Sequence, residues 1–377
     1  MIGFQPYETF QILVESGGID RANTLLVAAC DAFARRSRPT HGELVQFEAL
    51  TLRLFSTAAP SACAKAAKLL VASPHLTPAL ERLAVQHIGD GLGAYLTSAI
   101  AISPEIQLEI AETRGIADAA LLASRADLTR NVLAKLFSIN SRAVYRAIAA
   151  NTSLRFNGPW LAAIIRAARM DREVAMLLAA REDLDKALLA PAFFNLNEDA
   201  RLAVLRGFAS RRIPETALKR TYQQLSVASA ELSRALMKLY YANRRPEITR
   251  LFSQITGLDE IRCGEIAHDK GGSALFVVLR AFGCSSTEGL AVLVHSTAHE
   301  PRHARNLADY AKLFDQLSSD AMVFLMSIWR SEADLLMLSR PEYQPVTAPS
   351  NRIPPPAAGR SAVDRAIEAV QRIVANG

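Results

Sequence analysis

Apolar residues recur along this chain with the three- and four-residue spacing of amphipathic helices. Stripes of this kind begin at Leu76, at Ile102 and at Leu128. Sustained alternation of apolar and polar residues, which is typical of half-buried strands, is missing from the sequence. The pattern therefore predicts an all-helical chain.

The stripes belong to a unit that repeats along the chain. One apolar residue, termed the anchor, recurs at steps of 26, 26, 26, 30 and 29 residues; the anchors are Leu76, Ile102, Leu128, Leu154, Leu184 and Ile213. Several anchors are followed directly by a helix-capping residue or a proline, namely Thr77-Pro78, Ser103-Pro104, Thr129 and Pro214. A second apolar stripe follows within the unit, as at Val144 and Ile148. Each unit is therefore predicted to be a pair of helices.

A pair of short helices cannot bury both of its apolar faces, whereas consecutive pairs that stack on one another form a continuous core. Small residues at repeated positions would let neighbouring helices approach closely; they are Ala149, Ala150, Ala179 and Ala180. The alternative is an ordinary alanine-rich helical domain with accidental periodicity. Equal steps with matching flanking residues favour the stacked array.

The repeated segments share the pattern Ala-Ala-x-x-x-Leu-[Thr/Ser]-x-x-x-[Val/Leu/Ile], which resembles HEAT-like and leucine-rich-variant helical repeats. The whole arrangement is similar to the bacterial family known as domain of unknown function 2336. The resemblance covers about residues 45 to 300, from Phe47-Glu48-Ala49-Leu50 to Gly271-Gly272-Ser273-Ala274-Leu275 and beyond. It implies a right-handed α-solenoid of HEAT-like helical-hairpin repeats with a helical C-terminal subdomain, and it implies no catalytic residues.

The flanking sequence predicts how the array begins and ends. Thr40-His41-Gly42-Glu43 matches a capping box, which predicts a helix start before the repeats. From about residue 225 the repeat signature fades while helical stripes continue, and prolines become dense after Arg340. The predicted organisation is residues 1–62 as capping helices, 63–224 as the repeat array, 225–340 as a helical C-terminal subdomain, 341–360 as a proline-rich linker and 361–377 as an amphipathic tail helix.

The predicted tail helix carries one narrow apolar stripe, made of Val363, Ile367, Val370 and Val374. A single helix of this length is marginal in water, so it is expected to dock in a hydrophobic groove. The groove could belong to a partner, to a second copy or to this chain itself. Packing within the chain as an ordinary terminal helix, or fraying, is the alternative.

Arginine is far more frequent than lysine, and the formal net charge is +6. A nucleic-acid-binding solenoid is therefore the second functional hypothesis, in which one concave face would form a phosphate track from Arg166, Arg169, Arg211, Arg212 and Arg220. Acidic residues are interleaved with these arginines, notably Glu182-Asp183 and Glu198-Asp199, and they oppose that hypothesis.

The string His299-Glu300-Pro301-Arg302-His303 fits the zinc-protease pattern H-E-x-x-H and gives a distant third hypothesis, a metal-dependent hydrolase. That chemistry needs an unbroken helix, so that His299 and His303 lie on one face. Pro301 removes a helical donor and disfavours helix at the preceding residue, so the motif is predicted to be a loop that enters a new helix. The expected buried face of that helix is Leu307, Tyr310, Phe314 and Leu317.

No metal site or other cofactor is predicted. The four cysteines lack any Cys-x-x-Cys spacing and are expected to be small buried residues; they are Cys30, Cys63, Cys263 and Cys284. No apolar run reaches the length of a membrane span, and the first residues do not resemble a secretion signal, so a cytoplasmic location is expected. The favoured function is a non-enzymatic scaffold or regulator that binds a macromolecular partner, most simply a protein. The partner's identity and self-association remain open at this stage.

Overall fold

The computed structural model describes residues 19–73, 75–209, 211, 229–297 and 303–330. Every regular element in these residues is a helix and none is a strand, so the all-α prediction is confirmed. The chain divides into two compact units, residues 1–154 and 155–377. We describe each unit separately.

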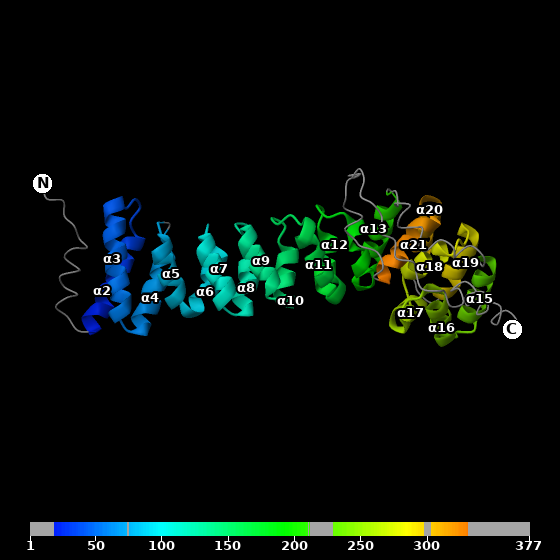
Figure 1. Cartoon of the computed structure of the whole chain (residues 1–377), viewed down its shortest axis with the longest axis horizontal. Helices are drawn as coiled ribbons and strands as arrows, with labels where there is room; N and C mark the ends of the chain where they lie inside the picture. The colour runs from blue at the N-terminus through cyan, green and yellow to red at the C-terminus, as the bar shows by residue number, and fades with distance from the viewer. Residues whose placement is uncertain (1–18, 74, 210, 212–228, 298–302, 331–377) are drawn as a thin grey trace, which may run out of the picture. The chain divides into compact units, whose positions relative to one another are not determined.

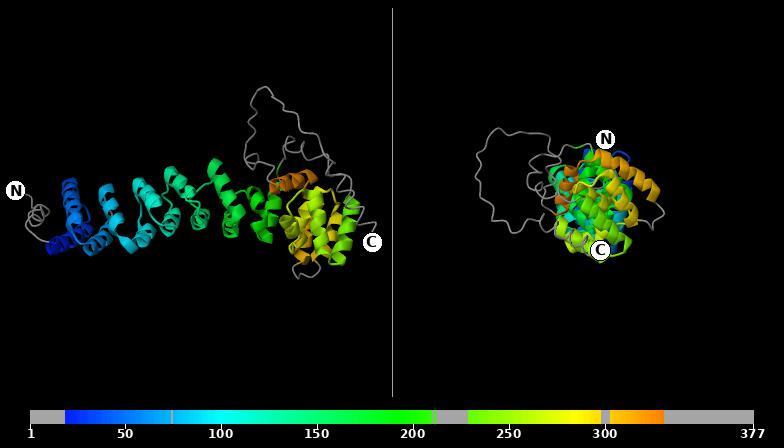
Figure 2. Two further views of the ribbon diagram at one scale, coloured as in Figure 1. Left: turned by 60° about the horizontal axis from the view of Figure 1, so that its bottom comes forward. Right: turned by 90° about the vertical axis from the view of Figure 1, so that its right-hand side faces the viewer.

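The first unit consists of short helices joined by tight turns. Its elements are α2 (Ile19–Ala34), α3 (His41–Thr57), α4 (Pro60–Leu70), α5 (Pro78–His87), the 3₁₀ helix η1 (Gly89–Gly91), α6 (Leu92–Ser98), α7 (Pro104–Thr113), α8 (Ile116–Ala123), α9 (Arg130–Ser138) and α10 (Arg142–Ala150). Helices α3, α5, α7 and α9 pack in one row, each on the next. In the other row α2 packs on α4, and α6, α8 and α10 pack in succession (Figures 1 and 2).

The helix starts predicted after Leu76, Ile102 and Leu128 are found in this unit, whereas Pro214 lies outside the described residues. Thr77 caps α5 by accepting a hydrogen bond from the Leu80 amide at 3.3 Å, and Thr129 caps α9 in the same way. Both arms of the Thr40–Glu43 capping box are present at the start of α3. The local capping chemistry therefore fixes where these helices begin.

The anchors contribute less to the core than their regular spacing suggests. Ile102, Leu154 and Leu184 are buried, whereas Leu76 and Leu128 are only half-buried, and Ile213 lies outside the described residues. The close-approach role expected of the small residues is wrong for Ala150 and Ala180, which are exposed at the ends of α10 and α12; Ala149 is buried and Ala179 is half-buried.

The second unit begins with a helix pair and continues into a helical cluster. Its elements are α11 (Gly158–Met170), α12 (Arg172–Ala180), the 3₁₀ helix η2 (Lys186–Asn195), α13 (Glu198–Ala209), α15 (Ser229–Tyr241), α16 (Arg245–Thr256), α17 (Glu260–Ala267), α18 (Ser273–Ala281), α19 (Ser286–Thr297), α20 (His303–Gln316) and α21 (Ser319–Trp329). The element that follows the anchor Leu184 is a 3₁₀ helix rather than an α-helix, and it contains Pro191, which an α-helix interior disfavours.

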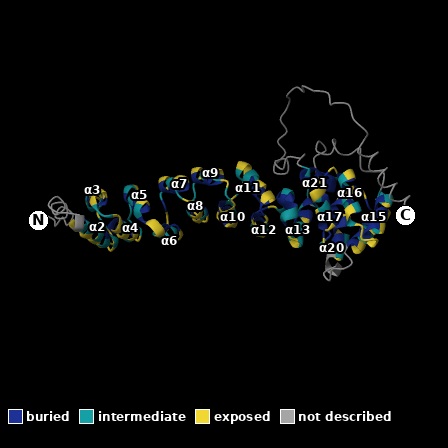
Figure 3. Ribbon diagram, turned by 90° about the horizontal axis from the view of Figure 1, so that it is seen from below, coloured by how far each residue is buried: buried dark blue, intermediate teal, exposed yellow. Residues whose placement is uncertain are grey.

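Helices α18 and α21 form the centre of this cluster, where they pack against each other. Residues 273–279 and 321–329 are buried without a break, as expected for helices that are covered on every side (Figure 3). The apolar stripes predicted after residue 225 are therefore core residues, for example Leu236 in α15 and Phe324 in α21. No helix in the described ranges is long and apolar enough to cross a membrane.

Candidate binding surface

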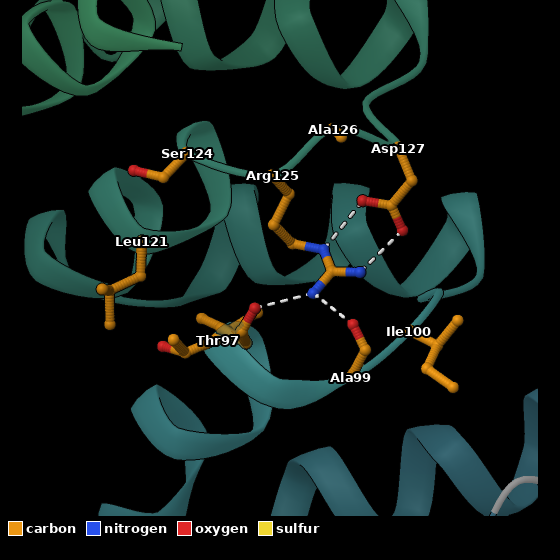
Figure 4. Close-up of a pocket in the computed structure, with 9 residues that line it drawn as sticks. Thr97, Ala99, Ile100, Leu121, Ser124, Arg125, Ala126 and Asp127 are labelled. Carbon is orange, nitrogen blue, oxygen red and sulfur yellow. Dashed lines mark hydrogen bonds and ion pairs between the residues drawn. The ribbon is translucent and has the colours of Figure 1, made fainter. Parts of the chain in front are cut away.

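In the first unit, side chains in the turns donate hydrogen bonds to carbonyl groups at the ends of helices. A helix leaves its last carbonyl groups without partners inside the helix. Arg125, in the turn after α8, donates from Nη1 to the carbonyl oxygens of Leu96 at 2.7 Å and of Ala99 at 3.0 Å, at the end of α6 (Figure 4). Its side chain is 8% exposed. The guanidinium thereby joins the turn after α8 to the end of α6.

Asp127 fixes the orientation of that guanidinium. It accepts a two-pronged pair of hydrogen bonds from Nε and Nη2 of Arg125, both at 2.8 Å, and another from the Ile102 amide at 3.0 Å. Burial alone would raise the pKa of Asp127, but the bonds from Arg125 and Ile102 outweigh it and hold the pKa below its ordinary value. The carboxylate is therefore ionised and structural.

The same type of contact recurs 26 residues further on, in the turn after α10. Asn151 donates from Nδ2 to the Ala123 carbonyl at 2.9 Å and to the Arg125 carbonyl at 2.7 Å. In the second unit the segment Arg181-Glu182-Asp183 repeats the Arg-x-Asp arrangement, and the bonds from Arg181 help lower the pKa of Asp183 to about 2. The recurrence of these turns could be predicted from the sequence pattern, but their hydrogen bonds to the end of the preceding helix could not.

Two hollows open beside these turns. The smaller has a volume of about 360 Å³ and is lined from the ends of α6 and α8, with Arg125 and Asp127 in its wall (Figure 4). The larger, of about 740 Å³, is lined by the turns before α5 and α7 and by Glu81 and Tyr95. Ile100 lines both hollows, and 97% of its surface is exposed. We term the lining of the two hollows the turn surface.

A buried hydrogen-bonded group lines the larger hollow. Glu81, which is 4% exposed, accepts hydrogen bonds from the Tyr95 hydroxyl at 2.7 Å, from the Ser103 amide at 3.2 Å and from the Ser103 hydroxyl. Ser103 precedes α7 but makes no side-chain cap, because its hydroxyl is directed to Glu81. Burial, and after it the bond to Glu81, raises the pKa of the Tyr95 phenol. Sequence reasoning missed this group, because its members are separated by 14 and 8 residues and match no motif.

Three of the five arginines singled out for nucleic acid lie within the described residues. Arg166 and Arg169 are exposed on α11. Arg211 forms an ion pair with Asp185, and burial lowers its pKa. Arg212 and Arg220 lie outside the described residues, as do the tail residues Val363, Ile367, Val370 and Val374.

The H-E-x-x-H string falls largely outside the described residues. Helix α19 ends at Thr297 and α20 begins at His303, so residues 298–302, with His299, are not described. Three of the four residues predicted for the buried face of the following helix are buried, namely Tyr310, Phe314 and Leu317; Leu307 is half-buried. No cluster of potential metal ligands occurs in the part of the chain that is described.

All four cysteines are buried and free, as expected, and burial raises their pKa values. A buried thiol with a raised pKa carries little thiolate at neutral pH. These residues therefore belong to the core.

A polar cluster lies inside the second unit, where α13 packs against α18 and α20. Glu198 accepts hydrogen bonds from the Ser273 hydroxyl at 2.9 Å and from the Tyr310 hydroxyl. Asp269 pairs with Arg201 at 3.2 Å. The cluster joins three helices, and its donors and acceptors are used within the fold.

Relative to the wild-type chain, the Glu198→Gln variant is expected to gain stability as the pH rises. Burial, and after it the charge on Asp269, raises the pKa of Glu198 above its ordinary value of 4.5. The folded chain then keeps a proton that the unfolded chain loses, so the contribution of Glu198 to stability falls as the pH rises from its ordinary pKa through the raised one. Urea unfolding of both proteins from about pH 4 to about pH 8 measures the effect. A difference that stays constant with pH would contradict it.

The described residues thus form an all-helical protein with two hollows beside the turns between its helices. A family model matches residues 107–326, from within α7 to within α21, and the chain belongs to that bacterial family, described as "Uncharacterised protein conserved in bacteria (DUF2336)". The family resemblance seen in the sequence is thereby confirmed. No curated protein and no solved structure matches the chain.

Proposed function

We propose that this chain is a non-enzymatic cytoplasmic scaffold or regulator that binds a protein partner through a right-handed solenoid of stacked helix pairs. The two rows of helices in residues 19–154 support the stacking, because helices in each row contact others of the same row. Solenoids offer long binding surfaces and need no special chemistry at any one point.

One observation carries the proposal, namely the position of Ile100. Its side chain is almost fully exposed between two hollows, at a turn held in place by Arg125. A lone exposed apolar residue needs no explanation, but one that stands between two concave sites offers a partner both a contact and adjoining pockets. Leu121, which is 40% exposed and lines the smaller hollow, extends the apolar surface.

Replacing Ile100 with aspartate is expected to lower partner binding at least tenfold, about 1.4 kcal/mol, because a charge would be buried in an apolar contact. The measurement is quantitative crosslinking capture from the native cell, with the wild-type chain as reference. The matched control is Ile116→Asp, since Ile116 is 55% exposed on α8 and lines neither hollow. Equal capture by both variants and the wild-type chain would place the binding surface elsewhere.

The tail helix is proposed as a second contact through Val363, Ile367, Val370 and Val374. Its support is the apolar stripe in the sequence. A chain that ends at Arg340 and captures the same partners in the same amounts would remove this part of the proposal. Steeply salt-dependent retention of the wild-type chain on DNA would instead favour the nucleic-acid alternative.

A further inference from the structure

Glu81 is a buried carboxylate that no cation of the described chain neutralises. Its hydrogen-bond donors are the Tyr95 hydroxyl and the amide and hydroxyl of Ser103, all of which are neutral. Within the described residues, no lysine, arginine or histidine forms an ion pair with it. Burying a charge without an opposite charge is costly, so such a carboxylate is a favourable site for an incoming cation.

The next repeat shows the contrast. Asp127 occupies the wall of the smaller hollow, and there Arg125 neutralises it through two hydrogen bonds of 2.8 Å. In the second unit Asp269 likewise pairs with an arginine, Arg201. Asp127 and Asp269 thus each pair with an arginine, whereas Glu81 accepts from neutral donors alone.

The larger hollow has room for a side chain beside that carboxylate. Its volume is about 740 Å³, and Glu81 is the one formally charged side chain that lines it. The remaining lining is apolar or carries hydroxyl groups, with Leu76, Ile100 and Ile102 as its large aliphatic residues. Both Glu81 oxygens accept from Tyr95 or Ser103, and the Ser103 amide is shared between them, at 3.2 Å from one and 3.3 Å from the other.

We propose that the larger hollow binds a lysine or arginine side chain of a protein partner, with Glu81 as the counter-ion and Ile100 in contact with an apolar residue beside that basic side chain. The inference rests on the proposed function and specifies the partner's chemistry at this site. The aliphatic stem of lysine or arginine suits the apolar wall, while the charged end suits the carboxylate.

The test uses the whole chain and a displayed library of random nine-residue peptides. The wild-type chain is expected to select peptides in which lysine or arginine stands next to a bulky aliphatic residue. Glu81→Gln keeps the size of the side chain but removes its charge, and it is expected to lose the selection of basic residues and to bind the leading wild-type peptide at least tenfold more weakly. The matched control is Glu105→Gln, an exposed carboxylate on α7 that lines neither hollow, and it should leave selection unchanged.

A second comparison tests the proposal even if the Glu81→Gln chain does not fold correctly. With the wild-type chain, the leading peptide in which the basic residue is replaced by glutamine should also lose at least tenfold in affinity, and Tyr95→Phe should keep the preference for basic residues. The pocket proposal would be overturned if the wild-type chain selected no peptides, or selected peptides without basic residues. It would also be overturned if the wild-type chain and a folded Glu81→Gln chain bound the leading peptide equally. If Ile100→Asp abolished capture of the partner and Glu81→Gln did not, the pocket proposal would be overturned while the proposed function would be supported.

Discussion

Replacing Arg125 with alanine is expected to destabilise the first unit by about 3 kcal/mol. The change removes a nearly buried guanidinium, leaves the Leu96 and Ala99 carbonyl groups without that donor, and leaves Asp127 without its cation. We place the loss at the lower end of the range for a broken buried pair because the side chain of Asp127 is 27% exposed. Loss of hydrogen-exchange protection over residues 92–127, together with urea unfolding, measures the effect.

Two further variants separate the guanidinium from a general effect of charge. Arg125→Lys keeps the positive charge but cannot reproduce the two-pronged contact with Asp127, so an intermediate loss is expected. Arg130→Ala removes an exposed arginine at the first position of α9 and should change stability by less than about 0.5 kcal/mol. Equal effects of Arg125→Ala and Arg130→Ala would show that Arg125 does not hold the turns together.

Replacing Gly289 with alanine is expected to destabilise the second unit by about 3 kcal/mol. A Cβ atom at this position of α19 would lie 2.1 Å from Cζ of Phe314. That ring is buried and packs edge-on against Phe276, with 4.7 Å between the ring centroids, so it has little room to move. Thermal and urea unfolding measure the loss.

Gly264→Ala is the matched control, and it is expected to change stability in the opposite direction. Gly264 also lies in a helix, α17, but the nearest atom that its Cβ would meet is Cγ2 of Thr249 at 4.0 Å. Alanine should stabilise this helix by about 0.5–1 kcal/mol, because it loses less conformational freedom on folding than glycine does. The same sign for both glycine variants would contradict the packing of Phe314 against α19.

Much of the local structure could be predicted because its causes lie close together in the sequence. The capping box at Thr40 and the helix starts after Thr77 and Thr129 depend on groups only three residues apart. The burial of Tyr310, Phe314 and Leu317 could likewise be anticipated from their spacing, whereas Pro301 lies outside the described residues. The family resemblance also came from the sequence alone and is confirmed by the match over residues 107–326.

The candidate site could not be predicted in the same way. Tyr95 and Ser103 approach Glu81 only because α5, α6 and the turn before α7 come together in space. No spacing along the chain encodes a three-residue contact of that kind. The exposure of Ile100 could not be predicted either. The periodic pattern singles out the nearby Ile102, which is buried, and says nothing about Ile100.

The sequence by itself determined the helical class, the ends of many helices and the family, since hydrophobic spacing and capping act over one or two turns of chain. Only the tertiary structure decided which polar residues of the turns became buried and what they bind. It gave Asp127 an arginine as partner and left Glu81 with neutral donors alone. The physical reason is that the free energy of a charged side chain depends on every group packed around it, and those groups come from different helices and turns.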